Sequence, residues 1–271
     1  MSKQSSSQAI ASAVALVLEA NSLAALATLI EAENGVGAKL LLAETGERTG
    51  SLGNSALDEA VAAYVKTFLG ARAEAQTFEL AELTTNLETQ LDVRILFERI
   101  EPEPRLVVCG AGHVGASLAR LARFIGYRTT LIDDRKDFVT RERFSEENIE
   151  LVVAQSWTDA VRESIGGGRG VSVAIVTRGH NEDEECLRAV MSTQPDYVGL
   201  IGSKRRTNIV LERLREAGVD EERLRKVRAP IGLDIGAVSP QEVALAILAE
   251  IVAERRGGAG EPLSAWRRND S

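Results

Sequence analysis

The sequence has few of the residues that cross-link small proteins or hold metal ions. It contains two cysteines and two histidines among 271 residues. Cys109 and Cys186 both fall within apolar stretches, and the chain has no C-x-x-C spacing. This pattern excludes a disulfide framework and a cysteine-ligated zinc site, and it predicts a protein of the reducing cytoplasm. We expect both cysteines to be core residues and not nucleophiles.

The chain also lacks an excess of positive charge and a long apolar run. Its 32 Lys and Arg stand against 40 Asp and Glu, which gives a formal net charge of −8. Nucleic acid is therefore not the expected partner, because its phosphates favour a basic face. No stretch reaches the roughly 18 apolar residues of a membrane span. The mildly apolar stretch 9–18 predicts a helix and not a signal peptide.

One stretch, residues 105–134, organises the rest of the chain. A short apolar run leads into Gly110, Gly112 and Gly115, which have G-x-G-x-x-G spacing. A helical pattern follows, whose apolar stripe runs to Ile125, and a second apolar run comes after it. This order is typical of a Rossmann unit, whose glycines allow a tight turn, close approach to a phosphate and close helix packing. Asp133 follows the second run, where a Rossmann acid would bind a ribose hydroxyl.

The proline-containing residues 101–104 separate two patterns. After them, five apolar runs alternate mostly with helical patterns, which predicts a parallel sheet of strand order 3-2-1-4-5 with a crevice between strands 1 and 4. Before them, the pattern predicts helices, a hairpin over 26–43 and a loop over 45–55. We therefore predict an α/β chain with a smaller N-terminal α+β domain (1–100), a Rossmann-like parallel-sheet domain (105–256) and a flexible tail (257–271). The five runs are 106–109, 129–132, 150–154, 172–176 and 197–201.

Both histidines follow predicted strands that flank this crevice. His113 and His180 are candidate ligand contacts or proton donors near neutral pH. The alternative is that each begins a helix or turn and bonds only to the backbone. Asn181 is expected to cap a helix. Asp183 can share a helix face with His180, as a polar or metal-binding pair, but without a third ligand a metal is not expected.

Two further segments carry candidate binding residues. Four polar residues follow predicted strand 5, and the cations among them oppose the dipole of the helix that they begin, so a bound phosphate would explain them. A solvated basic face is the alternative. Asp234 lies between two glycines in a non-helical segment, either as a loop residue over a ligand or as part of a turn. The four polar residues are Ser203, Lys204, Arg205 and Arg206.

Together these motifs resemble the XdhC/CoxI family of xanthine dehydrogenase accessory factors. The resemblance covers roughly residues 104–256. A weaker match covers residues 50–58, where many relatives have two glycines and a cysteine; here Asn54, Ser55 and Ala56 stand in that segment, and Asp58 replaces the usual glutamate. The motifs are GAGHVG (110–115), LIDDR (131–135), TRGHNED (177–183), GLIGSKRR (199–206) and APIGLDIGA (229–237).

The resemblance implies a maturation factor in preference to an enzyme. Such proteins bind molybdenum cofactor, as molybdopterin or its dinucleotide form, and protect it during sulfuration. They then pass it to an apo molybdenum hydroxylase of the xanthine dehydrogenase type. The implied partners are that hydroxylase and a sulfur-donating enzyme, and a homo-oligomer is expected. On this hypothesis the glycine turn and the cluster at 203–206 hold the anionic tail. His113, His180 and Asp234 then lie near the pterin, and the N-terminal domain covers the crevice or contacts the client.

Two other functions remain open from the residues. The first is an NAD-dependent oxidoreductase that uses the same crevice. In that case Asp133 and Asp134 favour NAD over NADP, because carboxylates repel a 2′-phosphate. The second is a scaffold with a vestigial nucleotide site, since folds are reused without their ligands.

Overall fold

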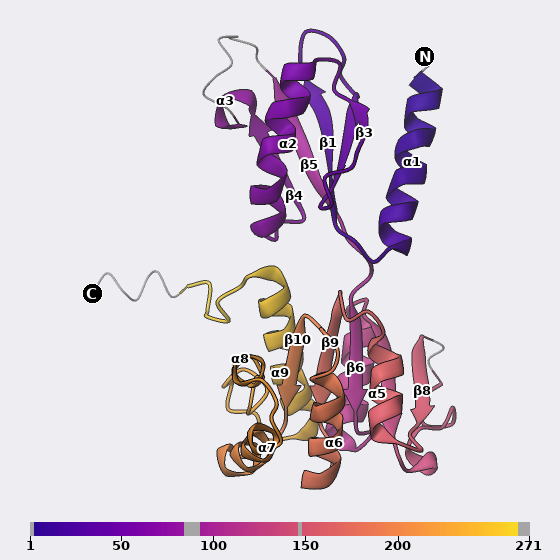
Figure 1. Cartoon of the computed structure of the whole chain (residues 1–271), viewed down its shortest axis with the longest axis vertical. Helices are drawn as coiled ribbons and strands as arrows, with labels where there is room; N and C mark the ends of the chain where they lie inside the picture. The colour runs from indigo at the N-terminus through magenta and orange to yellow at the C-terminus, as the bar shows by residue number, and fades with distance from the viewer. Residues whose placement is uncertain (1–2, 84–92, 146–147, 265–271) are drawn as a thin grey trace, which may run out of the picture. The chain divides into compact units, whose positions relative to one another are not determined.

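The chain divides into two compact units, residues 1–102 and 103–271 (Figure 1). A computed structural model describes residues 3–83, 93–145 and 148–264. Within these ranges no helix is both long and apolar enough to cross a membrane. The predicted tail lies outside the described residues from 265 onward, and residues 257–264 form turns and bends.

The N-terminal unit is an antiparallel sheet with a helix on each face. The side chains of β2 (Lys39–Ala43) alternate between the two faces. Leu40 and Leu42 belong to the core under α2 (Ser55–Gly70), whereas Leu41 packs with α1 (Lys3–Glu19). The predicted hairpin is confirmed. The sheet order is β3-β2-β1-β5-β4, from β1 (Ala24–Glu31), β2 (Lys39–Ala43), β3 (Arg48–Ser51), β4 (Ala75–Glu79) and β5 (Arg94–Ile100), with α1 (Lys3–Glu19), α2 (Ser55–Gly70) and the short α3 (Leu80–Leu83).

The predicted loop over 45–55 is wrong, because β3 lies inside it. This strand pairs with β2, with Gly50 opposite Leu40. Gly50 has φ +91°, and a Cβ there would lie 2.3 Å from the carbonyl oxygen of Lys39. The strand is short, polar and at the sheet edge, so it carries no apolar alternation that a sequence pattern can detect.

The C-terminal unit contains the predicted five-stranded parallel sheet. Its order, β10-β9-β6-β7-β8, is the expected 3-2-1-4-5 read from the other side. The observed strands agree with the predicted runs within about one residue. They are β6 (Arg105–Cys109), β7 (Arg128–Asp133), β8 (Ile149–Val153), β9 (Val171–Ile175) and β10 (Tyr197–Leu200).

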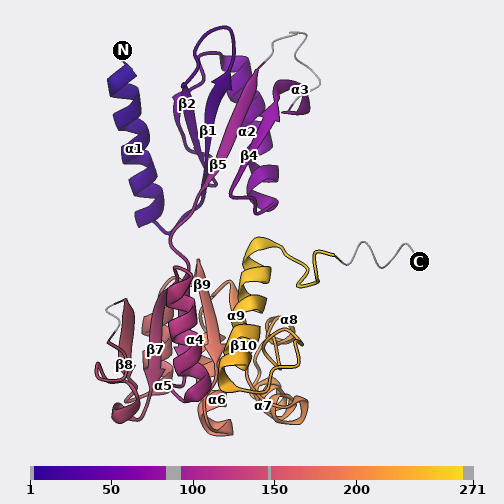
Figure 2. The same ribbon diagram turned by 180° about the vertical axis from the view of Figure 1, so that it is seen from behind.

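Helices cover both faces of this sheet. Leu106 and Val108 point into the core beneath α4 (His113–Phe124) and α9 (Pro240–Arg256), which lie side by side on one face (Figure 2). Val107 and Cys109 point into the core on the other face. That face is covered by α5 (Trp157–Ile165), α6 (His180–Val190) and α7 (Lys204–Glu216), with α8 (Glu221–Arg225) beside α7 (Figure 1). Within the described residues of the β7–β8 connection, 134–145 and 148, the one helical element is a 3-10 turn, η1 (Lys136–Phe138).

Two local predictions fail at helix ends. Asn181 does not cap α6, because the cap residue is Gly179 and Asn181 is already helical. Ile125 does not continue the apolar stripe of α4, because it is the C-cap residue and is exposed. By contrast, the Ser-x-x-Glu pattern at 239–242 predicts a capping box, and Ser239 and Glu242 form one at the start of α9.

Candidate functional site

The glycine turn after β6 leaves open space at one position only. A Cβ at Gly115 would lie 1.8 Å from the carbonyl oxygen of Gly110, and one at Gly110 would lie 2.6 Å from that of Val176. These two glycines therefore permit close packing of α4 and β9 against the turn. A Cβ at Gly112 would meet no atom within 4 Å. The middle glycine thus keeps space free above the turn.

Two helices begin at the carboxyl ends of neighbouring strands without a side-chain cap. The N-cap residues are Gly112 for α4 and Gly179 for α6, and neither has a side chain that bonds to the helix start. The backbone N–H groups and the positive dipole ends of both helices are features that bind phosphates. His113 and His180 are the first residues of these helices, and both are exposed. They flank one edge of the sheet, and their contact with a ligand stays a prediction.

Asp133, predicted to bind a ribose, points into the protein. Its side chain is 1% exposed and accepts a hydrogen bond from the backbone N of Ala111 at 2.7 Å. It also accepts bonds from Nε and Nη2 of Arg135, at 2.8 and 2.9 Å. Arg135 in turn stacks over the ring of Phe138. In this conformation Asp133 holds the glycine turn in place.

The neighbouring acid, Asp134, is paired at the surface. Nη1 and Nη2 of Arg178 donate to its two carboxylate oxygens at 2.7 and 2.8 Å. These hydrogen bonds lower the pKa of Asp134 to about 2, against the opposing effect of burial. Arg178 also lies 3.2 Å from Glu182. A surface carboxylate and a guanidinium therefore meet at the sheet edge, beside the glycine turn.

Asp183 is fully buried and joins three segments. Its carboxylate accepts a hydrogen bond from the Thr177 hydroxyl at 2.5 Å and two from Arg206 at 3.0 and 2.5 Å. Burial raises the pKa of Asp183 although these hydrogen bonds act in the opposite direction. Thr177 and Arg206 are thus the side chains that donate hydrogen bonds to Asp183.

The four polar residues at the start of α7 differ in their contacts: two interact within the protein and the other two are exposed cations. Arg206 is neutralised by Asp183, which explains one cation without a bound anion. Ser203 caps the helix by accepting from the backbone N of Arg206. Lys204 and Arg205 are exposed, and no described residue forms an ion pair with them. These two cations are the part of the cluster that remains for an anionic ligand.

Asp234 lies in the segment that leads into α9. Backbone hydrogen bonds attach this segment to β10 and α9, from Ile231 to Leu200 and from Leu233 to Ala246. Asp234 itself is exposed, and no hydrogen bond to it is found among the described residues. Its predicted place over a ligand stays a prediction.

Comparison with known proteins identifies the family. Residues 106–251 match the XdhC Rossmann domain, and residues 17–79 match the XdhC and CoxI family. The chain belongs to the XdhC and CoxI family.

Two curated relatives and one crystal structure extend this result. The chain is 28% identical over 162 residues to a probable xanthine dehydrogenase subunit of Bacillus subtilis (60% of this chain, 46% of that one). It is 25% identical over 187 residues to the molybdenum cofactor insertion chaperone PaoD of Escherichia coli (69% and 51%). The match therefore spans about half the length of each relative. A crystal structure described as a xanthine dehydrogenase from Bacillus halodurans has the same fold, with TM-score 0.52 at 16% identity and coverage of 94% and 98%.

This XdhC-type chain offers no exposed thiol. Both of its cysteines are buried, and burial raises the pKa of Cys186 well above its usual value. In the segment 50–58, which resembles the family's N-terminal motif, Asp58 accepts from the Ser51 hydroxyl at 2.7 Å and from the Leu52 backbone N at 2.8 Å. Asn54 caps α2. No group of three or more metal-ligating side chains occurs in residues 3–83, 93–145 and 148–264.

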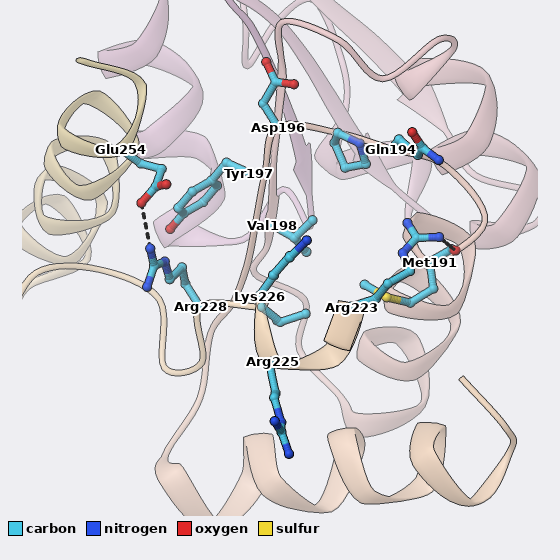
Figure 3. A pocket seen from close by; sticks show the side chains of 12 residues that line it. Met191, Gln194, Asp196, Tyr197, Val198, Arg223, Arg225, Lys226, Arg228 and Glu254 are labelled. Carbon is cyan, nitrogen blue, oxygen red and sulfur yellow. Dashed lines mark hydrogen bonds and ion pairs between the residues drawn. The ribbon is translucent and has the colours of Figure 1, made fainter. Parts of the chain in front are cut away.

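A basic hollow lies at the amino end of β10, and most of its cations are paired within the protein. This cleft of about 600 Å³ is lined by residues that include Arg223, Arg225, Lys226 and Arg228 (Figure 3). Arg223 donates to the carbonyl oxygens of Met191 and Thr193 at the end of α6, Arg228 pairs with Glu254, and Arg225 pairs with Glu221. Most of the cations in this cleft therefore stabilise the fold.

Sequence reasoning missed the roles of Arg178 and Arg135. Arg178 was part of the TRGH motif, but nothing local indicates that it pairs with a residue 44 positions away. The available signal was the position of each arginine, within three residues of the carboxyl end of a strand of the parallel sheet. Opposite charges at the ends of two such strands are expected to meet when the strands share a sheet edge.

Proposed function

We propose that this chain binds molybdenum cofactor as cargo and aids its sulfuration and insertion into a xanthine dehydrogenase-type hydroxylase. The observation that carries the proposal is the pair of uncapped helix starts at the ends of β6 and β9, with open space at Gly112. Family membership and the name of the Escherichia coli relative support it. The client hydroxylase, a sulfur-donating enzyme and self-association are parts of the same proposal.

The residues at the edge suit the phosphate-bearing tail of the cofactor. The N–H groups at the start of α4 would hold the phosphate, and Lys204 and Arg205 would add positive charge. His113 and His180, both exposed, would contact the pterin or donate a proton to it. With both cysteines buried, the chain would hold the tail and leave molybdenum to its own sulfur ligands.

A retention experiment tests this function. Purified chain is mixed with molybdenum cofactor released from a molybdoenzyme, separated by gel filtration and assayed for the fluorescent oxidised pterin. We expect the wild type to retain the pterin. We expect Gly112→Ala to retain at least tenfold less pterin than the wild type, because the added methyl group fills the open space. Gly167→Ala is the matched control, since a Cβ there also meets no atom within 4 Å, at the opposite end of the sheet. Absence of retention by the wild type would reject the proposal.

The NAD-dependent oxidoreductase is the second candidate, and the strand order and glycine turn favour it. Against it, the acid at the end of β7 that would bind ribose is turned inward onto Ala111 and Arg135. Calorimetric titration with NAD and NADP separates the two functions. Tight NAD binding without retention of molybdenum cofactor would favour the oxidoreductase.

A further inference from the structure

The ion pair between Arg178 and Asp134 spans the glycine turn. In the sheet, β6 lies between β9 and β7. Arg178 comes three residues after β9, and Asp134 comes one residue after β7. Adjacent strands lie about 4.8 Å apart, so the two outer strand ends are separated by roughly 10 Å. A bidentate pair that joins them must cross the carboxyl end of β6.

The turn is held from both sides beneath this pair. On the β7 side, the backbone N of Ala111 bonds to Asp133. On the β9 side, Gly110 approaches Val176 so closely that a Cβ would overlap it. The pair therefore lies along the route from the end of β7, across the start of α4, to the end of β9. A dinucleotide in a Rossmann crevice follows that same route.

We propose that the Arg178–Asp134 pair is a placeholder that the ligand displaces. On entry of a phosphate-bearing ligand, the guanidinium of Arg178 moves from Asp134 to the phosphate, and Asp134 becomes available to sugar hydroxyls. This inference rests on the proposed function for the location of the ligand. It assigns Arg178 as the phosphate-binding arginine of the site.

The other two paired arginines at this edge, Arg135 and Arg206, are less able to move to a ligand. Arg135 is bound to Asp133, and Arg206 is bound to Asp183, and these two carboxylates are 1% and 0% exposed. Removal of either arginine would leave an unpaired buried charge, which is costly. Asp134 is 30% exposed and Glu182 is 22% exposed, so water can solvate them when Arg178 leaves. Of the three paired arginines at this edge, Arg178 is thus the one most easily released to an anion.

The pairing also predicts the chemical class of the ligand. A phosphate alone would recruit Arg178 and leave Asp134 without a partner. A nucleotide diphosphate offers both a phosphate for the arginine and a ribose diol whose hydroxyls can donate to the carboxylate. A phosphate on that diol would be repelled by Asp134. The pair therefore selects a diphosphate with a free neighbouring diol.

Isothermal titration with ADP and inorganic pyrophosphate tests this inference on the full chain. Arg178→Gln is expected to weaken both probes at least tenfold. Asp134→Asn is expected to bind pyrophosphate at least threefold more tightly, because the competing carboxylate is gone. Arg48→Gln is the matched control, since Arg48 forms a bidentate, exposed pair with Glu59 in the other unit. Unfolding midpoints of all variants confirm that they fold.

The outcomes separate this inference from the proposed function. If Arg178→Gln binds ADP as the wild type does, or Asp134→Asn binds pyrophosphate no more tightly, the placeholder role is overturned even when the wild type retains molybdenum cofactor. If the wild type binds neither probe, the placeholder role is also overturned. If the variants behave as expected but the wild type retains no cofactor, the pair keeps its role and the proposed function falls.

Discussion

The buried carboxylate of Asp183 accepts two hydrogen bonds from the guanidinium of Arg206, 3.0 Å from Nε and 2.5 Å from Nη2. This contact ties the first turn of α6 to the first turn of α7. It also neutralises a cation that would otherwise oppose the dipole of α7. The carboxyl edge of the sheet thus contains two pairs with a buried carboxylate, Asp183–Arg206 and Asp133–Arg135, and a more exposed pair between Arg178 and Asp134.

Asp183→Ala is expected to lower the free energy of unfolding by about 3 kcal/mol, because it leaves Arg206 without its buried partner. Urea denaturation measures the change. Glu184→Ala, on the same helix, is the control: Glu184 forms more exposed pairs with Arg188 and Arg213, and its loss is expected to cost about 0.5 kcal/mol. Equal effects of the two substitutions would contradict a special role for Asp183.

Gly115→Ala is expected to destabilise the protein by about 3 kcal/mol or more, since the added methyl group would overlap the carbonyl oxygen of Gly110. Gly112→Ala has free space and is expected to cost less than about 1 kcal/mol, mainly through the poorer helix cap. Thermal unfolding of both variants checks the difference. A stable Gly115→Ala variant would show that the turn does not need this close packing.

The stability contribution of Asp134 is expected to depend on pH. Its pKa is about 2 in the folded state and 3.8 without its neighbours, so the contribution is present above about pH 4 and is lost as the pH falls towards 2. This shift corresponds to about 2.4 kcal/mol, which solvent screening of Arg178 reduces to about 1 kcal/mol.

The measurement compares the wild type with Asp134→Asn in urea between pH 7 and pH 2.5. The difference in unfolding free energy should be about 1 kcal/mol at neutral pH and should shrink below pH 4. A difference that stays constant over this range would show that the ion pair does not lower the pKa of Asp134.

Glu250 connects the segment before α9 to β10. Its Oε2 accepts from the Tyr197 hydroxyl at 2.5 Å and from the backbone N of Gly232 at 2.8 Å. Tyr197→Phe is expected to lower stability by about 1 kcal/mol. Tyr64→Phe is the control, because no hydrogen bond to its hydroxyl is found among the described residues. If chemical denaturation shows similar losses for both variants, the hydrogen bond to Glu250 contributes little.

Local patterns were sufficient for the parallel sheet and for the β1–β2 hairpin of the antiparallel sheet. The five apolar runs after residue 104 predicted the parallel strands, and the handedness of their crossovers predicted the order that brings β6 and β9 together. The helices α2 and α9 followed from apolar spacing and, for α9, from the Ser239–Glu242 capping box. The polar strand β3 was missed because it is recognised only through its pairing with β2.

By itself the sequence determined the family, the strand order and the position of the glycine turn, because apolar periodicity and glycine spacing are properties of neighbouring residues. Only the tertiary structure decided which charges meet: Asp133 turns inward to Ala111, Arg206 meets Asp183, and Arg178 meets Asp134. The physical reason is that the residues next to a charged side chain in the sequence do not indicate which distant residue will pair with it. Its partner is fixed by the strand ends that the folded sheet brings to one edge.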